Sequence, residues 1–173
     1  MTTPLIGIVI GSDSDLSCIR KTCDQLDAFG IPYELQICSA HRTPQAAHDY
    51  AAQAETRGLR VIIAAAGLAA HLAGVMASLT PLPVIGIPMA AGPLQGFDAL
   101  LATVQMPPGT PVGTMAIGEA GAVNAAIYAA AIIGAGDPAV REKLRAYKAS
   151  LTEKVAEKNR DLAARLKLKK DEA

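Results

Sequence analysis

The sequence predicts a three-layer α/β protein, in which a parallel sheet has helices on both faces and the chain ends in a long helix. Short apolar runs of strand length alternate with longer segments whose apolar residues recur at helical spacing, and this alternation is typical of parallel sheets. A charged segment after Asp137 carries one apolar stripe over many turns, which predicts the long helix. A length of 173 residues suits a single domain.

Five runs are candidate strands because each is short, apolar and bounded by glycine, proline or polar residues. They cover residues 5–10, 33–38, 60–65, 83–87 and 111–116. Strands connected by helices on both faces predict a parallel sheet in the flavodoxin-like order.

Helices are predicted after the first three strands, over residues 16–29, 44–57 and 72–79. Gly30 follows the first as a terminator, because glycine readily adopts the left-handed conformation that ends a helix. Thr43 is a candidate cap for the second helix, and Pro44 suits its first turn, where a missing N–H costs nothing.

Two helices are predicted at the end of the chain. Residues 119–133 are apolar around the whole circumference, which predicts burial on every side. The long charged helix begins at Asp137-Pro138, and its stripe consists of Val140, Leu144, Tyr147, Leu151, Val155, Leu162 and Leu166. This stripe outruns a small domain, so we expect it to cross a neighbouring subunit; the alternative is a helix folded back on its own sheet. We assign residues 1–160 to one domain that includes this helix from 138, and 161–173 to the end of the helix, with a frayed tail over 167–173.

Composition argues against several functional classes. The 16 basic and 16 acidic residues leave no net charge, which argues against a nucleic-acid-binding protein. Cys18, Cys23 and Cys38 have no C-x-x-C spacing, so we expect neither a disulfide framework nor a zinc site, and a cytoplasmic location. Hydrophobic residues make up 51% of the chain but aromatic residues only 3%, and this alanine- and glycine-rich composition predicts a homo-oligomer with helices buried between subunits.

Residues 61–79 form an apolar segment long enough to span a bilayer. Gly67, His71 and Gly74 interrupt it at points better explained by a strand, a turn and a helix, so we predict no membrane span there. We also expect no signal peptide, because no basic region precedes an apolar core at the start of the chain.

Polar residues follow the second predicted strand, in the segment Ser39-Ala40-His41-Arg42. Loops at the carboxyl ends of parallel strands are where ligands bind, so this loop and those after the neighbouring strands predict one crevice. An imidazole can act as an acid and then as a base near neutral pH, so His41 is a candidate for proton transfer, while the positive charge of Arg42 can fork onto a phosphate. The alternative is an Arg42 in a surface ion pair beside a His41 that caps the next helix.

The loop after the first strand, Gly11-Ser12-Asp13-Ser14-Asp15, has the features of an anion site. The hydroxyls of Ser12 and Ser14, with backbone N–H groups at a helix start, can cradle an anion. Asp15 can accept hydrogen bonds from a ribose diol. Two alternatives stay open: Asp13 and Asp15 hold Mg²⁺, although these loops have no further carboxylate, or Asp15 is simply the helix cap.

The loop after the third strand covers residues 66–71. A lone His71 amid alanine and leucine is more often packed and hydrogen-bonded than catalytic, so we expect it to orient the loop. His48 is assigned no function. No Ser-His-Asp order or Cys-His pairing suggests a covalent nucleophile.

Glycine and proline fix the shape of residues 94–114, which either wall the crevice or pack against another subunit.

Four segments together carry a specific resemblance. Gly11-Ser-Asp-Ser-Asp15, Ser39-Ala-His-Arg-Thr-Pro44, Ala69-Ala-His-Leu72 and Val104-Gln-Met-Pro107 resemble, in this order and spacing, the N5-carboxyaminoimidazole ribonucleotide mutase (PurE) family of purine biosynthesis. Residues 116–118 and 120–126 are also similar, so the resemblance covers residues 5–157. It implies an isomerase without cofactor or metal that moves a carboxylate from the exocyclic nitrogen of an aminoimidazole ribonucleotide to ring carbon four. Family members are homo-octamers whose sites form between subunits.

The same resemblance implies a role for each motif residue. His41 matches the family's proton shuttle, Ser12 and Arg42 look like phosphate ligands, and Asp15 looks like a ribose ligand. The further substrate contacts that it implies are Ser14, Ser39, Ala40, Gly67, Ala69, Ala70, His71 and Leu72.

Ala69-Ala-His-Leu72 resembles the mutase branch of the family rather than the branch that carboxylates aminoimidazole ribonucleotide directly with carbon dioxide. Leu68, Ala73 and Leu16 depart from the family pattern, which has Gly, Pro and Trp at these positions. Three alternatives therefore stay beside the mutase: the direct carboxylase, a relative that carboxylates a different nucleotide, and a flavodoxin-like module that binds a nucleotide without chemistry.

Overall fold

A five-stranded parallel sheet forms the centre of the computed structural model, which describes residues 3–171 of the chain and the side chains of residues 3–166. The strands are β1 (Ile6–Ile10), β2 (Tyr33–Ile37), β3 (Val61–Ala66), β4 (Val84–Pro88) and β5 (Gly113–Thr114). Their order is β2-β1-β3-β4-β5, which confirms the predicted flavodoxin-like topology. β1 lies between its two neighbours in register, with Ile6 opposite both Tyr33 and Val61.

The burial of the strands explains their composition. Every residue of β1 and β4 is buried, as is β3 up to Ala65, which accounts for their apolar runs. β2 is an edge strand, and its Leu35 and Ile37 side chains are exposed. β5 is shorter than predicted because only Gly113 and Thr114 pair with β4.

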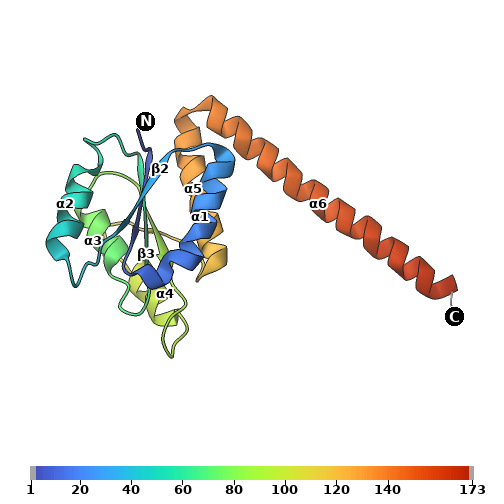
Figure 1. Cartoon of the computed structure of the whole chain (residues 1–173), viewed down its shortest axis with the longest axis horizontal. Coiled ribbons are helices and arrows are strands. Elements are labelled where there is room, and N and C mark those ends of the chain that lie inside the picture. The colour runs from blue at the N-terminus through green and yellow to red at the C-terminus, as the bar shows by residue number, and fades with distance from the viewer. Residues whose placement is uncertain (1–2, 172–173) are drawn as a thin grey trace.

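Helices cover both faces of the sheet (Figure 1). They are the short 3-10 helix η1 (Asp13–Asp15), α1 (Leu16–Phe29), α2 (Pro44–Ala54), α3 (Leu72–Leu79), α4 (Phe97–Val104), α5 (Glu119–Gly136) and α6 (Pro138–Asp171). One core joins α1 and α5 to Ile6, Ile8 and Ile10, and the other joins α2 and α3 to Val9 and Ile62. Successive side chains of a strand point to opposite faces, so β1 contributes to both cores.

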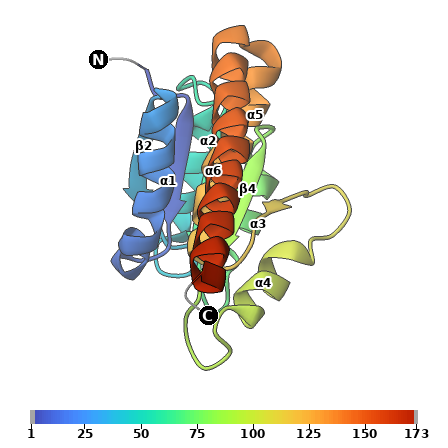
Figure 2. The same cartoon turned by 90° about the vertical axis from the view of Figure 1, so that its right-hand side faces the viewer.

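Local signals determine most helix ends, with two corrections to the predictions. Gly30 ends α1 in the left-handed conformation at φ 61°, as expected. Thr43 precedes α2, but its hydroxyl does not cap the helix: it donates to the Ser39 carbonyl and accepts from the Ser39 N–H, each at 3.0 Å. Helix α4, which projects from the end of the sheet, was not predicted from the sequence (Figure 2).

Within the single chain, helix α5 is buried on one side only, so the domain itself does not provide the predicted burial all round. Its small residues, such as Ala122 and Ala126, pack in the core, and the Thr22 hydroxyl donates to the Ala122 carbonyl at 2.8 Å. Asn124 and Tyr128 lie on the exposed side. Within the described residues, α5 alone is long and apolar enough to cross a membrane, but its packing against α1 is that of a core helix. The apolar segment 61–79 divides into β3 and α3, as predicted.

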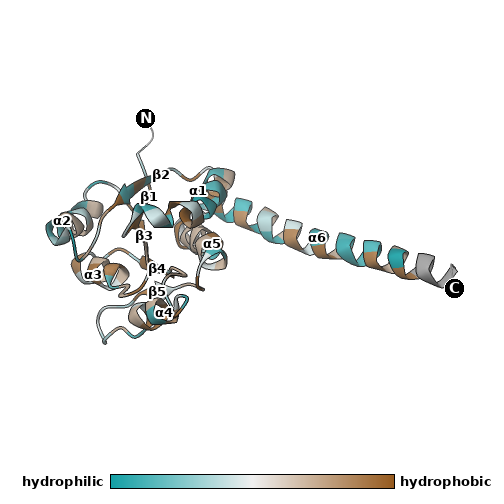
Figure 3. Ribbon diagram, turned by 60° about the horizontal axis from the view of Figure 1, so that its bottom comes forward, coloured by the Kyte–Doolittle hydropathy of each residue, from teal (hydrophilic) through white to brown (hydrophobic). Residues whose placement is uncertain are grey.

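Helix α6 leaves the domain and extends away from it (Figures 1 and 3). Val140 and Leu144 pack in the core, and Tyr147 meets Phe29 edge-on with ring centroids 5.5 Å apart. The later stripe residues are exposed, so a helix folded back on its own sheet is excluded: these are Leu151, Val155, Leu162 and Leu166. The backbone is helical through Asp171; of the predicted frayed tail, residues 172–173 lie outside the described part of the chain.

Candidate active site

The loops that follow β1, β2 and β3 enclose a cavity of about 470 Å³ at the carboxyl end of the sheet. It is lined by Gly11, Ser12, Ser14, Asp15, Ser39, Ala40, His41, Arg42, Ala66, Gly67, Leu68, Ala69, Leu72 and Ala91. The three loops therefore meet as the strand order requires. Of the candidate site residues, Ala70 and His71 do not line the cavity: Ala70 is buried, and His71 makes a hydrogen bond with His41, which does line it.

Arg42 is held between the first and second loops. One guanidinium nitrogen, Nη2, donates to the Gly11 carbonyl at 2.8 Å, and the backbone N–H of Arg42 donates to the Ser39 hydroxyl at 3.2 Å. Among residues 3–166, no carboxylate forms an ion pair with Arg42, so the surface ion pair is not its role. A second cavity of about 400 Å³ shares Arg42 with the first, so its charge borders both. The site therefore has a fixed cation at one end, suited to a phosphate.

The hydroxyl of Ser12 organises the first loop. It accepts a hydrogen bond from the Ser14 N–H at 3.3 Å, as an N-cap does, and donates to Asp13 at 3.1 Å. Asp15 directly precedes α1, at the N-cap position, but its side chain makes no capping hydrogen bond, which excludes the simple helix-cap interpretation. The described residues contain no group of three or more potential metal ligands, so Asp13 and Asp15 lack the further carboxylate that Mg²⁺ favours.

The Asp15 carboxyl is buried, with only 8% of the residue exposed. Burial raises its pKa above the ordinary value of 3.8, and Asp13 adds to this, whereas the hydrogen bond from the Ser14 hydroxyl opposes it. A buried carboxylate that makes no capping hydrogen bond is suited to accept hydrogen bonds from ligand hydroxyls.

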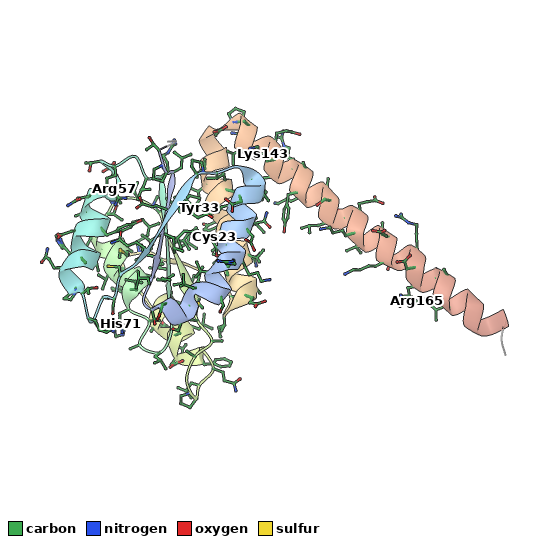
Figure 4. All side chains as sticks on the ribbon, in the orientation of Figure 1. Cys23, Tyr33, Arg57, His71, Lys143 and Arg165 are labelled. Atoms are coloured by element: carbon green, nitrogen blue, oxygen red, sulfur yellow. The ribbon has the colours of Figure 1, made fainter. Side chains whose placement is uncertain are left out.

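His41 and His71 form a hydrogen-bonded pair across the second and third loops. Nε2 of His41 lies 2.9 Å from Nδ1 of His71, and the rings meet edge-on with centroids 5.0 Å apart. One nitrogen must donate and the other accept, so the contact fixes the orientation of both rings. His71 is exposed rather than packed, and lies at the edge of the domain (Figure 4). Its hydrogen bond holds the ring of His41, whereas the predicted role was to orient its own loop. His41 remains at the cavity, where it can exchange a proton with a ligand.

The third loop is a tight turn above β3. The N–H of Ala70 donates to the Leu68 carbonyl and that of His71 to the Ala69 carbonyl, each at 2.8 Å. Leu68 adopts a left-handed conformation at φ 55°, which is unusual for a residue with a branched side chain.

Ala91 also lines the cavity and was not predicted from the sequence. It follows β4, the neighbour of β3, so the rule that ligands bind at the carboxyl ends of strands would have found it. Of the two alternatives for residues 94–114, walling the cavity is not seen within the single chain, where none of them lines it.

Comparison with known proteins identifies the family. The family model described as AIR carboxylase matches residues 5–154. A protein of Pseudomonas aeruginosa named N5-carboxyaminoimidazole ribonucleotide mutase is 54% identical over 151 residues, which cover 87% of this chain and 93% of that protein. A protein of the same name from Pyrococcus horikoshii is 53% identical over 92% of this chain and 89% of its own length.

Solved structures agree with the sequence comparisons. The crystal structure of Treponema denticola PurE has a TM-score of 0.83 at 27% identity, and the match covers 92% of this chain and 98% of that one. Family model, relatives and fold therefore agree over nearly the whole chain, and the sequence resemblance is confirmed. This chain belongs to the AIR carboxylase family.

Proposed function

We propose that this chain is an N5-carboxyaminoimidazole ribonucleotide mutase of purine biosynthesis, an isomerase that uses His41 to move the proton. The observation that carries the proposal is that His41 and Arg42 lie on one cavity of about 470 Å³. The imidazole of His41 is held by a hydrogen bond, and the guanidinium of Arg42 forms no ion pair with a carboxylate among the described side chains. Relatives named for this reaction share half or more of their aligned residues with the chain.

The polarity of the cavity supports one orientation of the substrate. The phosphate lies at Arg42 and Ser12, and the ribose diol donates to the buried carboxylate of Asp15. The aminoimidazole then points toward His41 and the turn after β3. Further contacts come from Ser14, Ser39, Ala40, Gly67, Ala69 and Leu72 along the cavity, with Ala70 and His71 supporting the turn.

The reaction needs proton transfer at two atoms. Protonated His41 donates to the exocyclic nitrogen, the bond from that nitrogen to the carboxylate carbon breaks, and carbon dioxide is released beside the ring. Ring carbon four then attacks the carbon dioxide, a carbon–carbon bond forms, and neutral His41 removes the proton from that carbon. The enzyme returns to its starting protonation state, so one histidine suffices. Acid–base help of this kind contributes about 10²- to 10⁴-fold to the rate.

The test of this function supplies N5-carboxyaminoimidazole ribonucleotide without ATP or metal and follows the 4-carboxy product. We expect conversion well above the rate without enzyme. The direct carboxylase is the second candidate, because Leu68 departs from the mutase pattern in the turn at the cavity. A second assay with aminoimidazole ribonucleotide and bicarbonate distinguishes the two enzymes. If product forms faster from this mixture than from N5-carboxyaminoimidazole ribonucleotide, the chain is a carboxylase.

Replacing Asp15 with Asn is expected to stabilise the fold and to raise the KM for substrate. Burial raises the pKa of Asp15, so the folded state binds its proton more tightly than the unfolded state does. The free energy of unfolding of wild type therefore falls as pH rises from about 3.8 through the raised pKa. The extra stability of D15N over wild type is complete above the raised pKa and vanishes below pH of about 3.8. Urea unfolding at several pH values measures this difference.

Asp24→Asn is the matched control for this prediction, because Asp24 is an exposed carboxylate on α1. It is expected to leave both stability and KM near the wild-type values. A D15N variant that unfolds more easily than wild type at neutral pH, or that binds substrate equally well, contradicts the assignment of Asp15.

We infer that the enzyme is a homo-oligomer, an octamer as the family resemblance implies. A groove of about 610 Å³ between α5 and the start of α6 is lined by apolar side chains such as Ile127 and Tyr128. On α4, Phe97, Leu101 and Val104 share one exposed face. Apolar surface of this extent on a small domain marks subunit interfaces.

Ending the chain after Ser150 is expected to lower the mass in solution. The truncation removes the exposed half of the α6 stripe but keeps Val140, Leu144 and Tyr147, which pack on the domain. Light scattering of both forms measures the change, and circular dichroism checks that the domain stays folded. An unchanged oligomer shows that the exposed half of α6 does not hold the subunits together.

The three cysteines support a cytoplasmic location. All are free thiols, with Cys38 buried and the other two half-buried. Burial raises the pKa of each, which keeps the unreactive thiol form. Unpaired cysteines are typical of proteins in a reducing compartment.

A further inference from the structure

The second loop, residues 39–43, is closed on itself by hydrogen bonds between its first and last residues. The Thr43 hydroxyl accepts a hydrogen bond from the Ser39 N–H and donates to the Ser39 carbonyl, each at 3.0 Å. The same carbonyl accepts from the Thr43 N–H at 2.8 Å. Two of these contacts therefore depend on the Thr43 side chain. His41 and Arg42 lie inside the closed turn, between the residues that it joins.

The Ser39 hydroxyl connects this closure to Arg42. It accepts from the backbone N–H of Arg42 at 3.2 Å, and Nε of the Arg42 guanidinium lies 3.5 Å from it. Nη2 of the same guanidinium donates to the Gly11 carbonyl at 2.8 Å. The guanidinium is therefore held from two sides, by the second loop through Ser39 and by the first loop through Gly11. A shift of Ser39 displaces one of these two supports.

Thr43 itself cannot bind the substrate's phosphate while the turn is closed. It lines the second cavity beside Arg42, but not the cavity that contains His41. Its only hydroxyl proton is donated to the Ser39 carbonyl, and a phosphate dianion offers only acceptors. The Ser39 hydroxyl differs, because no acceptor among the described residues takes its proton. Any effect of Thr43 on the substrate must therefore pass through the residues that the turn holds.

We propose that Thr43 is a positioning residue, whose hydroxyl closes the turn that presents Arg42 to the phosphate and His41 to the ring of the substrate. This inference rests on the proposed mutase function and adds a residue that does not line the cavity of His41. One substrate must meet both side chains at once, so their relative placement matters to the rate. Closing the turn fixes the backbone of both residues, and less freedom is then lost when the substrate binds.

Thr43→Val tests the hydroxyl with little change in size. The variant keeps the branched shape but loses both side-chain hydrogen bonds, which leaves the Ser39 N–H without that partner. We expect kcat/KM for N5-carboxyaminoimidazole ribonucleotide to fall about 10- to 100-fold, through a lower kcat and a higher KM, because His41 and Arg42 are both displaced. Thr43→Ser keeps the hydroxyl and is expected to keep most of kcat/KM. Thr43→Cys has a weaker hydrogen-bonding group and is expected to lie between the two.

Recognition of the phosphate gives a readout that a merely structural role would not change. Titration calorimetry compares the affinity of the 4-carboxy product with that of the same compound lacking its phosphate. In T43V the preference for the phosphorylated form is expected to fall about tenfold. In an Arg42→Met background, T43V is expected to change this preference no further, because its effect passes through the guanidinium.

Thr56→Val is the matched control for T43V. The Thr56 hydroxyl also donates to a backbone carbonyl, that of Gln53 at 2.9 Å, but it lies past the other end of α2 and lines neither cavity. T56V is expected to leave kcat, KM and the phosphate preference unchanged. Thermal unfolding followed by circular dichroism checks that each variant is folded at the assay temperature.

The outcomes separate this inference from the proposed function. Wild type that forms no product overturns the mutase function, and the phosphate preference then tests Thr43 by itself. Folded T43V with wild-type kcat, KM and phosphate preference overturns the role of Thr43; if T43V does not fold, the same result in T43C does so. An equal loss in T43S and T43V, or a further loss of phosphate preference in the double variant, also overturns it.

Discussion

Replacing His41 with Asn is expected to lower kcat for the mutase reaction by about 10²- to 10⁴-fold. Asparagine is polar and of similar reach, but it cannot hold and return a proton near neutral pH. KM is expected to change little, because Arg42 and Ser12 remain to bind the phosphate. Steady-state rates with N5-carboxyaminoimidazole ribonucleotide measure both constants, and binding of the substrate's stable product checks that the cavity is intact.

His48→Asn is the matched control for His41. His48 lies on α2, where its Nδ1 is 3.2 Å from the Asp49 carboxylate, and it does not line the cavity. It is expected to leave kcat unchanged. Full activity in H41N, or an equal loss in H48N, contradicts the assignment of His41 as the proton shuttle. If nucleotide binding persists and no conversion is seen even in wild type, the chain is a binding module instead.

Replacing Gly121 with Ala is expected to lower the free energy of unfolding by about 1–3 kcal/mol. Gly121 lies in the first turn of α5, and an added Cβ would overlap the carbonyl oxygen of Ala116 and stand 2.8 Å from its carbonyl carbon. Backbone atoms cannot move aside as a flexible side chain can, so α5 must shift from the core that it shares with α1. Urea unfolding followed by circular dichroism measures the loss.

Gly136→Ala tests the alternative that any alanine in α5 has this effect. Gly136 ends the same helix, and the nearest heavy atom to a Cβ there, on Arg60, is 3.9 Å away. The substitution is expected to leave stability unchanged or to raise it by about 0.5–1 kcal/mol, because alanine is the better helix former. Equal stability of G121A and wild type contradicts the close contact between α5 and residue 116.

The elements of the fold could be predicted where a single sequence pattern is strong. Runs such as those of β1 and β4 are buried on both faces, so apolar composition alone identifies them. Helix α4 was missed because its apolar side chains, Phe97, Leu101 and Val104, face away from the core and glycine and proline surround it. Thr43 matched a capping pattern, yet its hydroxyl bonds Ser39 because the loop folds back on itself. A capping pattern in the sequence does not show which of several possible partners a hydroxyl will bond.

The site was predictable as a set of loops but not as a set of contacts. Strand order brings the segments around Ser12, His41 and Gly67 together, and the order followed from the alternation of elements. Two features depend on distances between segments: the pairing of His41 with His71, and the packing of Leu68 on Gly92. No spacing in the sequence encodes them.

The sequence by itself determined the α/β class, the strand order, the three loops at the carboxyl edge and the family. Each of these follows from short-range patterns, namely apolar runs, helical spacing and motif residues close together in the chain. Only the tertiary structure decided that Asp15 is buried without capping α1, that Arg42 bonds the Gly11 carbonyl, and that α6 leaves the domain. These features are set by the close packing of segments distant in the chain, where burial and the choice among hydrogen-bond partners depend on the whole fold.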